Sequence, residues 1–131
     1  MTDHPGRRPL IGVATCAAAP DLDEDGPLLV SALTDAGADV RVGVWDSEAV
    51  SWPEFPVVLV RSTWDYPLRR AEFLDWTRRC RRTANPRDVL AWNTDKRYLD
   101  DLAAAGVATI PTIFLDPGQP LRATGTPRAT P

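Results

Sequence analysis

Val57-Val58-Leu59-Val60 runs directly into Arg61-Ser62-Thr63-Trp64-Asp65-Tyr66, and the fold can be inferred outward from this junction. The apolar part does not alternate with polar residues, which predicts a strand buried on both faces of a parallel sheet. The polar part would form the loop that leaves the carboxyl end of this strand, where open α/β sheets bind ligands. Arg61, Trp64 and Asp65 are therefore candidate binding residues. The alternative is a structural turn in which Arg61 and Asp65 pair with each other.

Strand and helix patterns alternate on both sides of this junction. Residues 10–15 and 39–46 contain β-branched strand candidates, and residues 28–36 and 69–80 place apolar side chains at helical spacing. Such alternation predicts a mostly parallel sheet with right-handed crossovers and helices packed on it. The expected inner face of the second helix consists of Phe73, Trp76, Thr77 and Cys80.

The remaining segments have weaker patterns. Residues 81–84 are a poor candidate for a fourth strand, and residues 89–92 fit either a short strand or one helical turn. A helical pattern follows, with Asn93 or Thr94 as its expected cap. Residues 107–115 are expected to be extended, with Pro111 limiting them to a sheet edge or to two short pieces. We expect residues 1–9 to be a disordered lead-in and residues 116–131 a flexible tail.

Composition excludes several classes of protein. The net charge of -3 argues against nucleic acid as the main partner, because nucleic-acid binding favours a basic surface. No apolar run approaches the ~20 residues that span a bilayer, so no membrane partner is expected. Cys16 and Cys80 lack metal-ligand spacing and are most simply reduced, buried thiols in a cytoplasmic protein.

Few residues offer familiar catalytic chemistry. The two commonest glycine-rich phosphate loops are missing, and the single histidine, His4, lies in the expected disordered lead-in. An acidic run, residues 21–25, precedes a helix N-terminus, where it would complement the helix dipole; a metal site is the alternative interpretation. Lys96 follows a polar cap and could meet a nucleotide phosphate, or it could be an exposed lysine paired with Asp100.

Several segments together resemble a known family. Their order and spacing are similar to the front part of an ATP-grasp ligase of the glutathione synthetase/RimK-like group, over roughly residues 10–115. The resemblance implies an α/β fold, a three-layer Rossmann-like pre-ATP-grasp domain with a mostly parallel sheet at residues 10–92. It also implies that residues 93–115 are the incomplete entry to the nucleotide-binding region. The segments that carry it are Asp25–Leu29, Val44–Asp46, Val57–Tyr66, Phe73–Trp76, Asn85-Pro86, Trp92–Leu99, Ala105–Val107 and Ile110–Thr112.

The same resemblance implies a reaction. Family members use ATP and Mg²⁺ to activate a carboxylate as an acyl phosphate, which an amine or similar nucleophile then attacks. By resemblance, Lys96 would contact ATP phosphate, and Arg61, Trp64 and Asp65 would form the substrate side, binding a small carboxylate or amino acid.

The departures from the family pattern concern catalysis. The second lysine, the adenine hinge, the glycine-rich loop and the metal-binding carboxylates of the family are not found, so no catalytic residue and no metal ligand is assigned. We expect a chain truncated before the ATP-grasp core or disrupted in frame, which is inactive alone, does not bind ATP or Mg²⁺ tightly and needs the missing ATP-grasp C-terminal part as its partner. The alternatives are a non-catalytic α/β module that binds a small ligand through Arg61 and, less favoured, a receiver-like or flavin-binding domain.

Overall fold

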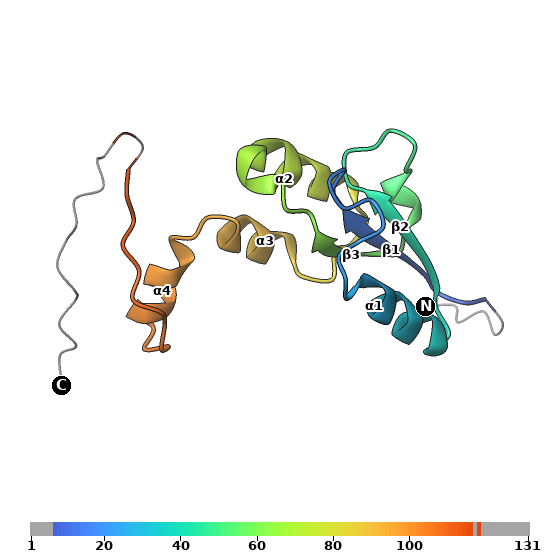
Figure 1. The fold of residues 1–131 in the computed structure, drawn as a ribbon, viewed down its shortest axis with the longest axis horizontal. Coiled ribbons are helices and arrows are strands. Elements are labelled where there is room, and N and C mark those ends of the chain that lie inside the picture. Colours follow the sequence, from blue (N-terminus) through green and yellow to red (C-terminus); the bar gives the residue numbers. More distant parts are fainter. Residues whose placement is uncertain (1–6, 117, 119–131) are drawn as a thin grey trace. The chain divides into compact units, whose positions relative to one another are not determined.

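The computed structural model describes residues 7–116 and 118, and it divides the chain into two compact units, Met1–Asp95 and Lys96–Pro131 (Figure 1). Most of the predicted disordered lead-in and flexible tail lies outside the described residues. The predicted end of the α/β domain at residue 92 stays a prediction. Each unit is described by itself.

The first unit is built on a three-stranded parallel sheet. Its strands are β1 (Leu10–Thr15), β2 (Asp39–Val44) and β3 (Val57–Ser62), in the spatial order β2-β1-β3. In the central strand, Ile11 lies opposite Val40 on one side and Val57 on the other. The parallel sheet is confirmed, and all three strands end at the same edge, which brings the loops after β1 and β3 together.

Two helices lie on opposite sides of this sheet (Figure 1): α1 (Gly26–Asp35) and α2 (Arg70–Arg79). Pro27 lies in the first turn of α1, where its missing N–H costs no hydrogen bond. After α1 the chain passes through Gly37, whose φ of 93° is unfavourable for residues with a side chain. Helix, sheet and helix form the predicted three layers.

An aromatic core fills the space between the sheet and α2. Phe73 and Trp76 of α2 pack with Trp45, which follows β2, and with Trp52 of the 3₁₀ turn η1 (Trp52–Glu54). The Trp52 and Trp76 ring centroids are 5.2 Å apart with an angle of 84° between the planes, an edge-to-face contact. The predicted inner face of α2 is confirmed, because all four of its residues are buried.

Residues 81–84 contribute a rudimentary fourth strand. The backbone N–H of Val58 donates to the carbonyl of Arg82 at 2.9 Å, and the N–H of Ala84 donates to the carbonyl of Val58 at 2.9 Å. These bonds form one isolated parallel bridge between Val58 and Thr83. The chain then enters α3 (Arg87–Asn93), so the ambiguous residues 89–92 are helical.

The second unit contains α4 (Tyr98–Ala104). Its N-cap is Arg97 without a side-chain cap, so the predicted cap at Asn93 or Thr94 is wrong, because α3 extends through Asn93 and the new helix begins four residues beyond Thr94. Residues 107–115 form no strand, so the sheet-edge alternative is wrong, while their extended backbone stays a prediction. No helix among residues 7–116 and 118 is long and apolar enough to cross a bilayer.

Candidate functional site

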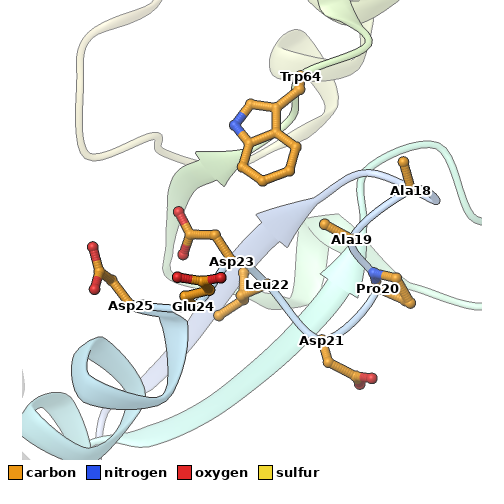
Figure 2. Close-up of a pocket in the computed structure, with 9 residues that line it drawn as sticks. All are labelled: Ala18, Ala19, Pro20, Asp21, Leu22, Asp23, Glu24, Asp25 and Trp64. Carbon is orange, nitrogen blue, oxygen red and sulfur yellow. The ribbon is translucent and has the colours of Figure 1, made fainter.

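An open hollow of about 630 Å³ lies beyond the carboxyl ends of β1 and β3. Its walls are the loop that follows β1 and the side chain of Trp64, which follows β3. Figure 2 shows the indole of Trp64 pointing toward the loop, with Asp23 and Leu22 across from it and Asp21 directed away. The hollow therefore occupies the crevice in which parallel α/β sheets bind ligands. Its lining consists of Ala18, Ala19, Pro20, Asp21, Leu22, Asp23, Glu24, Asp25 and Trp64.

Trp64 is the aromatic surface of this hollow. Its side chain is 58% exposed, although the residues on either side of it in the chain are more buried. A large ring left open to solvent beside carboxylates provides a face for stacking and for cation–π contact with an ammonium group. The predicted binding residue Trp64 thus lies in the hollow.

Arg61 is connected to the hollow through Asp23. Its guanidinium lies 3.1 Å from Asp23 Oδ2, and this ion pair ties the loop after β1 to β3. The pairing of Arg61 with Asp65, considered as the alternative from the sequence, is wrong. Because Arg61 already pairs with Asp23, any further carboxylate bound to Arg61 would share its guanidinium with Asp23. Such sharing is feasible, since a planar guanidinium can donate to two acceptors at once.

Asp65 faces away from the hollow and into a polar network. Its Oδ1 accepts a hydrogen bond of 2.9 Å from the buried indole N–H of Trp45, and its Oδ2 lies 3.7 Å from Arg69. The Arg69 guanidinium also lies 4.7 Å from the Trp45 ring centroid. This network joins the end of β2, the loop after β3 and the start of α2. The predicted role of Asp65 in substrate binding stays a prediction.

Arg69 is the centre of that network. It lies 2.5 Å from carboxylate oxygens of both Asp46 and Glu72. The hydrogen bond from Arg69, with a smaller Coulombic contribution, lowers the pKa of Glu72. The hydrogen bonds to Glu72 and Asp46 raise the pKa of Arg69, which favours the charged guanidinium.

The loop after β1 has a restricted backbone. Leu22 adopts a φ of 73°, which is uncommon for a residue with a branched side chain. Gly26 allows this path, because a Cβ at position 26 would lie 2.3 Å from the Cβ of Leu22. The Thr15 hydroxyl donates to the carbonyl of Ala19, and the backbone N–H of Cys16 donates to the carbonyl of Ser62. These contacts hold the start of the loop against β3.

The acidic run does not form a metal centre in the structure. No group of three or more His, Cys, Asp or Glu side chains that could hold a metal ion occurs in the described part of the chain. Asp25 is the N-cap of α1 but makes no side-chain capping bond. The sequence identified the acidic run, yet its position along one wall of the hollow depends on the path of the loop, which no local motif indicates.

Lys96 belongs to the second unit. Its Nζ lies 5.7 Å from the ring centroid of Tyr98, and its carbonyl accepts the backbone N–H of Leu99. The predicted phosphate contact of Lys96 is not tested by this geometry. Sequence reasoning also missed Trp45 and Arg69 as the residues that contact Asp65, since Trp45 is twenty positions from Asp65 in the chain.

Comparisons with known proteins assign the first unit to a family. Residues 11–87 match the model of the N-terminal domain of D-cycloserine synthetase DcsG. The chain is 38% identical over 112 residues to the cycloserine biosynthesis protein DcsG of Streptomyces lavendulae, covering 83% of this chain and 38% of that protein.

A solved structure agrees with this match. The crystal structure of D-cycloserine synthetase DcsG superposes with a TM-score of 0.74 at 37% identity, covering 84% of this chain and 38% of that one. The chain thus spans about 38% of the length of the relatives it matches. Because the family match runs from β1 into the start of α3 and includes every residue of the hollow, the chain belongs to the D-cycloserine synthetase DcsG N-terminal domain family.

Proposed function

We propose that this chain is the substrate-side domain of an ATP-dependent ligase of the D-cycloserine synthetase type, related to the glutathione synthetase/RimK-like ATP-grasp enzymes. The reaction would join a carboxylate to a nitrogen nucleophile through an acyl phosphate. The observation that carries the proposal is that the family match covers both walls of the hollow, the loop after β1 and Trp64 after β3. We also propose a cytoplasmic location, where ATP is available and where the free thiols Cys16 and Cys80 stay reduced.

The described residues do not fit a complete ATP and Mg²⁺ site. They contain no carboxylate cluster suited to a metal, and Lys96 is the single lysine of the chain. We therefore assign the binding of ATP and Mg²⁺ to an ATP-grasp part outside the described residues, with Lys96 as the residue that this chain would direct toward a phosphate. No chemical step is assigned to the residues of the first unit.

The residues of the first unit would bind and orient the substrate. D-cycloserine, named as the product of the related enzyme, is a small ring that carries an amino group. The Trp64 face and the carboxylates of the loop suit a protonated amine through cation–π and charge–charge attraction. Arg61, at the edge of the hollow through its pair with Asp23, suits a carboxylate or the carbonyl derived from one.

Binding of the product tests this proposal. D-cycloserine titrated into the isotope-labelled 131-residue chain should shift amide NMR signals of residues 18–25 and of Trp64. L-cycloserine serves as the control for stereochemistry, and Mg-ATP should leave these signals unchanged. In Trp64→Ala the D-cycloserine shifts should be lost, whereas Leu68→Ala, which removes a 91% exposed apolar side chain outside the hollow, should retain them.

The outcomes separate the candidate functions. If D-cycloserine shifts signals elsewhere or none at all, the hollow is not the product site and the proposal fails. If an unrelated small carboxylate binds through Arg61 while D-cycloserine does not, the non-catalytic binding module is favoured. A chimera tests the ligase directly, with residues 10–115 of this chain replacing the matching part of the S. lavendulae protein. ATP-dependent cycloserine formation by this chimera, abolished by Trp64→Ala, would support the substrate-side role.

A further inference from the structure

A second surface, at the amino ends of β1 and β3, is rich in arginine. Two adjoining hollows of about 360 and 270 Å³ lie there, and Arg81 lines both of them. They are at the opposite end of the strands from Trp64, since Pro9, Leu10 and Pro56 line the larger one. We call this the arginine surface, and its five arginines are Arg7, Arg8, Arg81, Arg82 and Arg87.

The positive charge of the arginine surface is largely uncompensated. Glu54 and Asp88 are its only carboxylates among the residues lining the two hollows. None of its arginines forms an ion pair with a residue that the structure describes, and Arg87 instead donates to the main-chain carbonyls of Thr77 and Cys80. Neither hollow is lined by the arginines of the first unit that pair with carboxylates, Arg61, Arg69 and Arg78. A concentration of unpaired guanidinium groups in an acidic chain indicates an anionic partner.

The geometry favours an extended partner over a compact phosphate. Phosphate cradles depend on several converging backbone N–H groups, and Pro9, Pro56 and Pro86 in the lining have none. The main donors are therefore the side chains of four exposed residues along the two hollows, Arg7, Arg8, Arg81 and Arg82. Carboxylates spaced along a polypeptide can each pair with one guanidinium, since the guanidinium fork matches a carboxylate in two-point contact. We propose that the arginine surface binds an extended acidic polypeptide segment.

Binding of a fluorescein-labelled poly-L-glutamate peptide to the full chain, followed by fluorescence anisotropy, tests this proposal. The complex should form at low salt and weaken as salt rises toward about 0.15 M, because exposed charges are screened over about 8 Å at that ionic strength. Arg81→Ala should weaken binding by about three- to fivefold, the loss of one exposed ion pair. Arg41→Ala is the matched control, because it removes the same charge from an exposed position on β2 that lines neither hollow.

Several results would overturn the proposal. Equal weakening in Arg81→Ala and Arg41→Ala would show only general attraction to a charged molecule. Tighter binding of a single-stranded oligonucleotide or of tripolyphosphate than of poly-glutamate would replace the acidic polypeptide with a phosphate-bearing partner. If Arg81→Ala does not fold, as judged by circular dichroism, Arg8→Glu takes its place and should weaken binding more than fivefold, because it removes one ion pair and adds a repulsive charge. None of these outcomes depends on the ligand of the Trp64 hollow.

Discussion

Replacing Trp76 by alanine measures how much the aromatic core contributes to stability. The side chain is fully buried, and its ring centroid lies 5.9 Å from that of Trp45, 5.2 Å from Trp52 and 5.4 Å from Phe73. Removal of a buried tryptophan typically costs about 3–5 kcal/mol. The indole N–H has no hydrogen-bond partner among the residues that the structure describes, so its removal also relieves an unsatisfied donor, which is worth about 1–3 kcal/mol. We therefore expect a loss of about 2 kcal/mol, below the usual range for a buried tryptophan.

Urea unfolding followed by far-ultraviolet circular dichroism is the appropriate assay, because fluorescence would itself change with the number of tryptophans. Trp64→Ala is the matched control and should cost less than about 1 kcal/mol, since its ring is 58% exposed and belongs to the hollow. A small domain is stable by about 5–15 kcal/mol, so the Trp76→Ala chain should keep a measurable unfolding transition. Trp76→Phe, which keeps a ring, should then give an intermediate loss. Equal costs for Trp76→Ala and Trp64→Ala would refute the core assignment.

Three further changes follow from individual contacts. Gly26→Ala should destabilise the chain by about 1–3 kcal/mol in urea unfolding, because the new methyl group would lie 2.3 Å from the Leu22 Cβ. An unchanged unfolding midpoint would show that the loop moves to accommodate the methyl group. Burial raises the pKa of the Cys80 thiol to about 11, so stability should fall as pH rises from about 9 to about 11, and Cys80→Ala should flatten that decline. The hydrogen bond from Arg69 lowers the pKa of Glu72, so its stabilising contribution should be lost as pH falls through that lowered pKa; carboxyl NMR titration should show the pKa returning toward normal in Arg69→Gln.

The sequence predicted the parts of the fold that have strong periodicity. Phe73, Trp76, Thr77 and Cys80 recur at helical spacing, and each of them is buried in the structure. The unbroken apolar run before Arg61 correctly indicated a strand of a parallel sheet. These predictions succeed because burial of apolar surface is the main driving force of folding. The spacing of apolar residues in the sequence therefore indicates which side chains face the core. The predicted burial of that strand on both faces is wrong, because Val58 is the only buried residue among residues 57–60.

The parts that could not be predicted depend on backbone bonds and distant contacts. Thr83 pairs with Val58 through main-chain groups, so the polar residues 81–84 carry no side-chain signal of a strand. The helix α4 begins after Arg97 without a capping side chain. The prediction of a cap at Asn93 or Thr94 assumed that a polar capping residue marks the start of the helix, and here none does. Helix boundaries of this kind are weakly determined by local sequence.

Trp64 and Asp65 show why the candidate site needed the structure. The two residues are neighbours in the turn after β3, yet the indole borders the hollow while the carboxylate accepts a hydrogen bond from Trp45. Asp65 can therefore fix the backbone on which Trp64 stands without touching a ligand. A loss of ligand binding in an Asp65 variant would then report a displaced Trp64 rather than a missing contact. Retained binding in Asp65→Asn, which keeps an oxygen acceptor for Trp45, would distinguish this positioning role from direct recognition by charge.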